Sequence, residues 1–199
     1  MRKFNDLSEL PSAAQLKKEL NRRRYRKSFR AALKNTAASF AVAAAAAVLL
    51  SYLVLPVIRV TGTSMEPTLS NDHIVLCSKL KTASRGDIIA LYYNKKILLK
   101  RVIAVAGDTV DIDESGAVTL NGAPLREPYI RAEALGECDI TFPYTVKENR
   151  WFVMGDNRET SVDSRYSAFG CVADENILGV VRVRLYPFGL PHLLENPDA

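Results

Sequence analysis

The chain has 199 residues and a formal net charge of +5 at pH 7, from 27 lysines and arginines against 22 aspartates and glutamates. The excess of positive charge comes largely from an N-terminal arm, residues 1–34, so it does not indicate that the protein binds nucleic acid. The three cysteines form no CxxC motif and have no histidine pair nearby, which argues against a metal site.

The first predicted element is a membrane-spanning helix over residues 35–58, where no charged residue occurs. About 20 helical residues cross a hydrocarbon core, so this segment is long enough. The alternative is a buried, alanine-rich helix of a soluble domain, but the strongly basic flank favours a span. The basic residues before the segment are Lys17, Lys18, Arg22, Arg23, Arg24, Arg26, Lys27, Arg30 and Lys34.

Such a basic flank predicts the orientation of the span, because positively charged segments stay in the cytoplasm. Residues 59–199 would then lie outside the cell membrane after a single pass. A cleavable secretory signal is the alternative. The basic arm is long, however, and residues 55–59 offer no small-x-small cleavage site, which favours an uncleaved signal anchor. Ser12 and Gln15 predict a capping box that opens a helix running on into the span.

The remaining residues, 59–199, have the size of one domain and a β-rich pattern. Short β-branched and aromatic runs alternate with turn sequences, and a helical period is not sustained. We therefore expect a mostly β fold, a folded-over antiparallel sheet or barrel, preceded by one transmembrane helix. The predicted strands are residues 73–77, 88–93, 97–105, 110–112, 118–120, 151–154 and 179–186.

Ser64 is a candidate nucleophile because it stands a few residues beyond the span, in RVTGTSMEPTL. A serine at that position is well placed for peptide bonds of another chain that emerge from the membrane. The only histidines are His73 and His192, so a Ser-His-Asp triad is poorly supplied. Another side chain must act as the base.

Lys100 is the best candidate base. On a strand, alternate side chains share a face, which places Lys100 with Leu98, Val102 and Ala104 on an apolar surface, opposite Arg101. Burial there disfavours the ammonium and would lower the pKa from about 10.4 towards roughly 8, giving a neutral amine that accepts a serine proton. The alternative is a solvated or paired lysine that snorkels from the strand.

A polar loop, residues 155–170, follows the apolar strand at 151–154. Its hydroxyl, carboxylate and guanidinium groups could simply bond one another in Asx and Ser/Thr turns. The loop also supplies what a Ser/Lys pair needs, a hydroxyl at Ser161 to orient the amine and an Asp163–Arg165 pair to hold the loop. A disulfide between Cys138 and Cys171 is possible but is not fixed by the sequence.

Four segments in order, TSMEPTL, RGDIIALYY, LKRVIAVAGD and GDNRETSVDSR, resemble the successive motifs of type I signal peptidases. These membrane-bound Ser/Lys serine proteases remove signal peptides from exported proteins. The single span and short catalytic region resemble the compact branch usual in Gram-positive bacteria. The resemblance implies Ser64 as nucleophile, Lys100 as general base, Ser161 as orienting hydroxyl, Asp163 and Arg165 as a supporting pair, and Asp156, Asn157 and Arg158 as shaping the loop.

One position departs from the family pattern. Some relatives carry an oxyanion-binding serine two residues before the nucleophile, where this chain has Gly62. The Ser64 amide would then act with a backbone group or water.

The resemblance further implies acyl transfer through an acyl-enzyme, without metal or cofactor. An extended substrate would lie beside residues 59–63 and 98–99, with small pockets for Ala-x-Ala. Met65 and Ile97 could line these pockets, although core packing is the favoured role for Ile97. The expected contacts are Thr63, Met65, Leu98 and Leu99. The expected partners are preproteins leaving the secretion translocon and the lipid bilayer, and the chain is expected to be a monomer.

Other classes compete with this interpretation. A soluble, self-cleaving Ser/Lys repressor would need a DNA-binding module in place of the span. A membrane-anchored β-domain without activity would not need Ser64 and Lys100. Within the enzyme class, the sequence leaves open a dedicated role on a narrow substrate set such as pilins.

Overall fold

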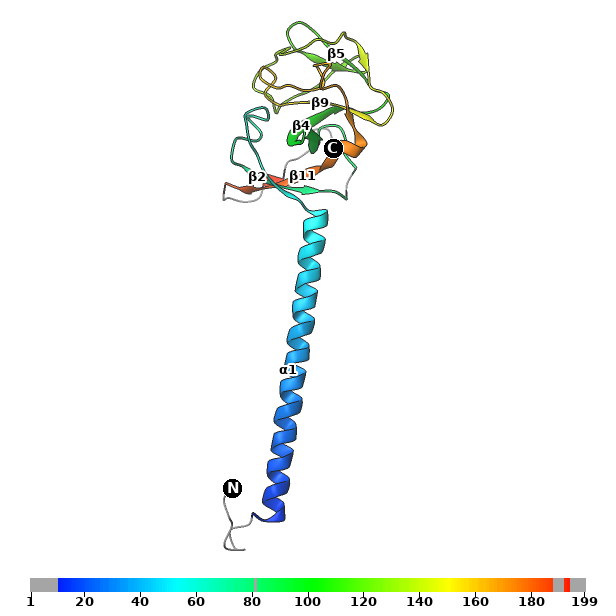
Figure 1. Cartoon of the computed structure of the whole chain (residues 1–199). Coiled ribbons are helices and arrows are strands. Elements are labelled where there is room, and N and C mark those ends of the chain that lie inside the picture. The colour runs from blue at the N-terminus through cyan, green and yellow to red at the C-terminus, as the bar shows by residue number, and fades with distance from the viewer. Residues whose placement is uncertain (1–10, 81, 188–191, 194–199) are drawn as a thin grey trace. The chain divides into compact units, whose positions relative to one another are not determined.

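The computed structural model describes residues 11–80, 82–187 and 192–193 (Figure 1). Its contacts divide the chain into two units, Met1–Leu50 and Ser51–Ala199. The first element, α1, is a continuous helix over Ala13–Val54. The predicted capping box opens it, because the Ser12 N–H donates to Gln15 Oε1 at 2.9 Å and the Gln15 N–H donates to Ser12 Oγ at 3.4 Å.

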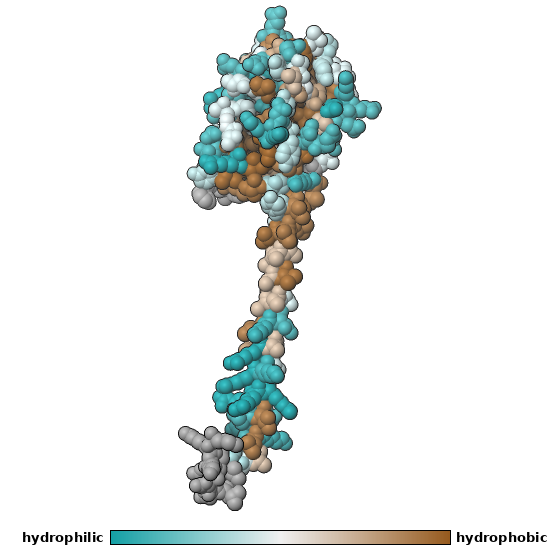
Figure 2. All heavy atoms as spheres, in the orientation of Figure 1, coloured by the Kyte–Doolittle hydropathy of each residue, from teal (hydrophilic) through white to brown (hydrophobic). Residues whose placement is uncertain are grey.

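The apolar part of α1 could cross a membrane by its length and composition, with a mean hydropathy of 2.1 and none of that window buried. Figure 2 shows hydrophilic side chains along the N-terminal part of this helix and apolar ones along its C-terminal part. The helix ends at Val54, before the expected end of the span at residue 58. Pro56 explains the difference, because it lacks an N–H and disfavours helical backbone at Leu55. Residues Val57–Arg59 form strand β1 instead.

The described residues of the second unit form an eight-stranded antiparallel sheet, which confirms the predicted fold class. The strand order is β1-β2-β11-β3-β4-β9-β10, and β12 pairs with β11. The sequence missed the short β1, β10 and β12, and it placed the other boundaries within two residues. The remaining strands of this sheet are β2 (Ile74–Ser78), β3 (Ile88–Tyr93), β4 (Lys96–Ala104), β9 (Arg150–Met154), β10 (Val172–Ala173), β11 (Ile177–Tyr186) and β12 (His192–Leu193).

A second, four-stranded sheet in the order β7-β6-β5-β8 is also antiparallel. It consists of β5 (Thr109–Ile112), β6 (Val118–Leu120), β7 (Ala123–Pro124) and β8 (Tyr144–Thr145), of which β7 and β8 are too short to be predicted. A short 3₁₀ helix, η2, covers Asp174–Asn176. Figure 1 shows β4 and β9 lying between β5 on one side and β2 with β11 on the other.

Strand β4 contributes to all of the hydrophobic clusters that fill this unit. Leu99 packs in the cluster that contains Met65, and Val102 packs in the cluster that contains Val153. Ile103 and Ala104 pack in a third cluster, together with apolar residues of the second sheet. Leu98 and Val102 share the cluster expected beside Lys100, but Ala104 does not. A shift of register between Val102 and Ala104 moves Ala104 into the cluster of Ile103, because a bulge breaks the alternation of faces.

Candidate active site

Ser64 lies in the connection between β1 and β2, in a turn that is stabilised by hydrogen bonds within the turn and to neighbouring residues. The Glu66 N–H donates to the Thr63 carbonyl at 3.1 Å, and Met65 is buried beneath. Gly62 opens the turn with a φ of 93°, in the left-handed region that favours glycine, and its N–H donates to the Asn71 side chain at 3.0 Å. Ser64 is half-buried, so it is accessible to a substrate.

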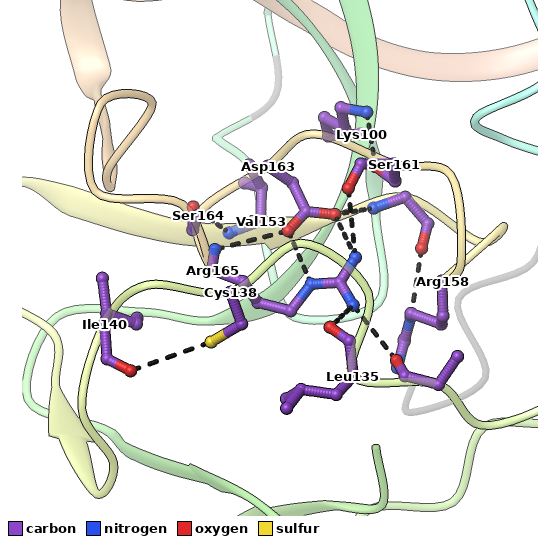
Figure 3. A network of polar contacts seen from close by, with 12 residues as sticks. Lys100, Leu135, Cys138, Ile140, Val153, Arg158, Ser161, Asp163, Ser164 and Arg165 are labelled. Atoms are coloured by element: carbon purple, nitrogen blue, oxygen red, sulfur yellow. Dashed lines mark hydrogen bonds and ion pairs between the residues drawn. The ribbon is translucent and has the colours of Figure 1, made fainter. Parts of the chain in front are cut away.

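Lys100 is buried in β4, with only 3% of its surface exposed, and it pairs across the sheet with Ile89 of β3. Its Nζ lies 2.7 Å from Ser161 Oγ and donates to it (Figure 3). Burial lowers the pKa of Lys100 to about 8; Arg165 adds to this, whereas Asp163 and Asp156 oppose it. The predicted desolvation is confirmed, and the lysine neither snorkels nor forms an ion pair of its own among the described residues.

The pair Asp163–Arg165 is fully buried and bidentate, with Arg165 Nε 2.8 Å from Asp163 Oδ1 and Nη2 2.9 Å from Oδ2. Burial alone would raise the pKa of Asp163, but the hydrogen bonds and charge of Arg165 hold it below its ordinary value. Figure 3 shows the Arg165 guanidinium between Asp163, Leu135 and the segment that carries Ser161. The predicted loop is therefore a fixed structure and not a solvated turn.

Asn157 and Asp156 connect this loop to the serine turn and to β4. The Asn157 N–H donates to the Ser64 carbonyl at 3.0 Å, and its side chain donates to the Thr63 carbonyl at 3.3 Å. Asp156 receives two hydrogen bonds from Arg101, at 2.8 and 2.7 Å. Arg101 was not predicted as a site residue, because the sequence does not show that its side chain is buried.

Gly155 is the point at which the segments of the site meet. A Cβ built on this residue would lie 2.3 Å from Ser161 Oγ and 2.4 Å from the Ser64 carbonyl oxygen, far closer than real atoms allow. The absence of a side chain at Gly155 therefore lets Ser161 Oγ and the Ser64 carbonyl oxygen occupy the space that a Cβ would fill. The structure thus brings the Ser64 main chain close to Ser161, which accepts the hydrogen bond from Lys100.

A small pocket adjoins Ser64 between the segment 58–62 and the start of β4. Of the four expected contacts, Met65, Leu98 and Leu99 line it together with Ser64, whereas Thr63 does not. The Thr63 carbonyl instead accepts a hydrogen bond from the Asn157 side chain. Ile97 lines it too and is 42% exposed, so the expected core role of Ile97 is wrong. The lining residues are Ile58, Arg59, Val60, Thr61, Gly62, Ser64, Met65, Ile97, Leu98 and Leu99.

The other candidate groups lie outside this site. Cys77, Cys138 and Cys171 all carry free thiols, so the possible disulfide does not form. The ring of His73 accepts a hydrogen bond from the Ser70 N–H at 3.1 Å, in a turn of its own. Within the described ranges no group of three or more histidine, cysteine, aspartate or glutamate residues could hold a metal ion.

Comparison with known proteins places these features in context. Residues 33–186 match the family model "Signal peptidase, peptidase S26". Signal peptidase I S of Bacillus subtilis is 34% identical over 164 residues, which cover 76% of this chain and 88% of that protein. Signal peptidase I of Bacillus amyloliquefaciens is 31% identical over 170 residues, covering 80% and 91%. The crystal structure of a signal peptidase I from Enterococcus faecalis is 33% identical, with a TM-score of 0.43, and covers 51% of this chain and 98% of that one.

Proposed function

The chain belongs to the signal peptidase family, peptidase S26, and from that premise we propose that Ser64 and Lys100 are its catalytic dyad. Family membership makes the protein a membrane-anchored serine peptidase that cleaves signal peptides. The assignment of the dyad rests on the buried Lys100, whose Nζ is hydrogen-bonded to Ser161 Oγ. Ser161 in turn packs beside the Ser64 main chain at Gly155.

In the proposed mechanism, neutral Lys100 accepts the proton of the Ser64 hydroxyl as Ser64 attacks the scissile carbonyl. Ser161 holds the amine in place during this transfer. The protonated lysine then gives its proton to the leaving amine of the mature protein. A water molecule, activated by the same lysine, hydrolyses the acyl-enzyme and restores Ser64.

The oxyanion that forms during the attack needs hydrogen-bond donors. The Ser64 N–H is the first donor in our proposal, and a backbone group or water is the second. Gly62 supports this assignment, because it has no hydroxyl and its left-handed φ of 93° would strain a serine at that position.

The substrate binds as an extended strand in our proposal, because free strand edges border the pocket. In the described part of the chain, β1 pairs only with β2, and residues 96–100 of β4 pair only with β3. A peptide between them finds unpaired backbone groups to bond. Met65, Leu98 and Leu99 form a tight pocket that favours small side chains such as those of Ala-x-Ala.

Cleavage of a purified preprotein tests this proposal. The full-length protein in detergent should cut a substrate carrying Ala-x-Ala directly after the second alanine. Replacing that alanine with leucine should stop cleavage because the pocket is small, whereas the same replacement at the middle position, as a matched control, should not. Cutting at unrelated sites would contradict the proposed specificity. Rescue of bulk secretion in a cell depleted of its own signal peptidase would then indicate a general role, and rescue of a few substrates a dedicated one.

We further propose a single pass with the basic arm in the cytoplasm and residues 59–199 outside. The cationic side chains of α1 before residue 35 support this orientation. Protease added outside intact protoplasts should digest the β-rich unit and leave an N-terminal fragment protected. Full protection of the β-rich unit would reverse the orientation.

A further inference from the structure

An irregular segment that connects two strands of the second sheet packs against the polar loop, residues 155–170. It joins β7 to β8 over residues 125–143, and we call it the clasp. The carbonyls of Ala134 and Leu135 accept hydrogen bonds from Arg165 Nη1 at 3.1 and 2.5 Å. The clasp belongs to none of the four motifs of the sequence, yet it supplies partners to the polar loop.

Glu127 of the clasp forms a buried ion pair with Arg158 of the polar loop. Its carboxylate receives two hydrogen bonds from Arg158, at 2.8 and 2.5 Å, and the two side chains are only 5% and 0% exposed. Such a pair loses much hydration, so its net contribution to stability is small, and its value lies in fixing geometry.

Arg158, whose side chain is fixed by Glu127, also binds the main chain of Gly155. Its Nε donates to the Gly155 carbonyl at 3.0 Å, while the Gly155 N–H donates to Asp163 at 3.0 Å. Both ends of the residue are therefore held by charged groups. Because Ser161 Oγ and the Ser64 carbonyl oxygen both lie against the side of Gly155 where a Cβ would stand, a shift of this peptide would change how the segments that carry Ser64 and Ser161 pack together.

Tyr129 connects the clasp to Arg101, which binds the residue after Gly155. Its hydroxyl donates to Glu127 at 2.8 Å, and its ring lies 3.8 Å from the guanidinium carbon of Arg101. Arg101 in turn holds Asp156, the neighbour of Gly155. Glu127 and Tyr129 thus support Gly155 through Arg158 and Asp156 through Arg101.

We propose that Glu127 is a positioning residue of the peptidase reaction, which acts through Arg158 and the Gly155 peptide to set the spacing between Ser64 and the Ser161–Lys100 pair. The inference rests on the proposed dyad. Glu127 does not touch the reacting atoms, and its effect is therefore on the placement of the groups that do.

The test compares Glu127→Gln and Glu127→Ala in the full-length protein, with preprotein cleavage as the readout. We expect kcat to fall about 10- to 100-fold in the alanine variant and less in the glutamine variant, which keeps one acceptor for Arg158. KM should stay unchanged, because the substrate pocket is formed by other residues.

The pH profile separates positioning from general destabilisation. Lys100 is surrounded by Ser161 and by the charges of Asp163, Arg165 and Asp156, and loosening of the loop would admit water to it. The rising limb of kcat against pH should therefore move to higher pH in Glu127→Ala. Asp113→Asn is the matched control, because Asp113 is an exposed carboxylate whose hydrogen bonds, among the residues that the structure describes, stay within its own turn in the second sheet. It should leave both kcat and the limb unchanged.

A double variant, Glu127→Leu with Arg158→Leu, guards against misfolding caused by an unpaired buried charge. It should fold and still show the lower kcat. If either folded Glu127 variant keeps the parental kcat and pH limb, Glu127 is a structural residue only. A parent chain that cleaves no preprotein would instead overturn the proposed function, so the two failures are distinct.

Discussion

The Lys100→Arg variant should cleave no preprotein, and Ser64→Ala should be equally inactive. Arginine stays protonated at any working pH, so it cannot accept the serine proton however well it fits. Losing a nucleophile or its base lowers turnover by on the order of 10⁴- to 10⁶-fold, and the double variant should lose no more than either single one. Single-turnover cleavage assays measure this, and residual turnover in Lys100→Arg above that of Ser64→Ala would rule out Lys100 as the base.

The pH dependence of the parent enzyme follows from the same residue. Only the neutral amine is active, and the pKa of Lys100 is lowered to about 8. Turnover should therefore rise with pH through about 8 and level off above it.

Lys100→Met provides a stability control for the inactive variants. Below pH 8 Lys100 is protonated in both the folded and the unfolded chain, so the folded state contains a buried charge. The pKa is lowered from 10.5 to about 8, which corresponds to a cost of about 3 kcal/mol in the free energy of folding. Methionine removes that cost, so the variant should melt at higher temperature at pH 7. Between about pH 8 and 10.5 the unfolded parent binds more protons than the folded one, so the parent gains stability with pH and the difference disappears.

Asp163→Ala should lose both stability and activity. Arg165 would be left as a buried, unpaired charge, and breaking such a pair on one side costs about 3–5 kcal/mol. The loop that carries Ser161 would then lose its fixed position, and turnover would fall with it. Thermal melting and preprotein cleavage of the full-length variant measure the two effects.

Two further variants separate these effects. Asp163→Leu with Arg165→Leu should recover part of the lost stability but none of the activity. Asp72→Asn breaks an ion pair of the same 2.8 Å length with Arg59 and keeps a residue that tolerates the left-handed backbone at this position (φ 68°); because the pair is exposed, its loss should cost no more than about 1 kcal/mol of stability. Normal melting and cleavage by Asp163→Ala would mean that the loop needs no buried pair.

The sequence predicted those features that depend on local pattern. Alternation along β4 placed Lys100 on a buried face, and the uncharged segment with its capping box predicted α1. Partners distant in the chain were not predictable in this way. Arg101 could equally have faced solvent, and its contact with Asp156 depends on the pairing of β4 with β9. The contact of Glu127 with Arg158 likewise depends on how the second sheet packs, for which a single sequence carries no periodic signal.

The junction between α1 and β1 has a consequence for the integrity of the enzyme itself. The carbonyls of Val54 and Pro56 accept hydrogen bonds from Lys79 and Cys77, and β1 is paired with β2 from Val57 onwards. The residues that follow α1 are thus already incorporated in a sheet, so their backbone groups are not available to bind as an added strand beside the pocket. If substrates bind as extended strands, as we propose, we expect the enzyme to spare the end of its own helix because that backbone is already paired.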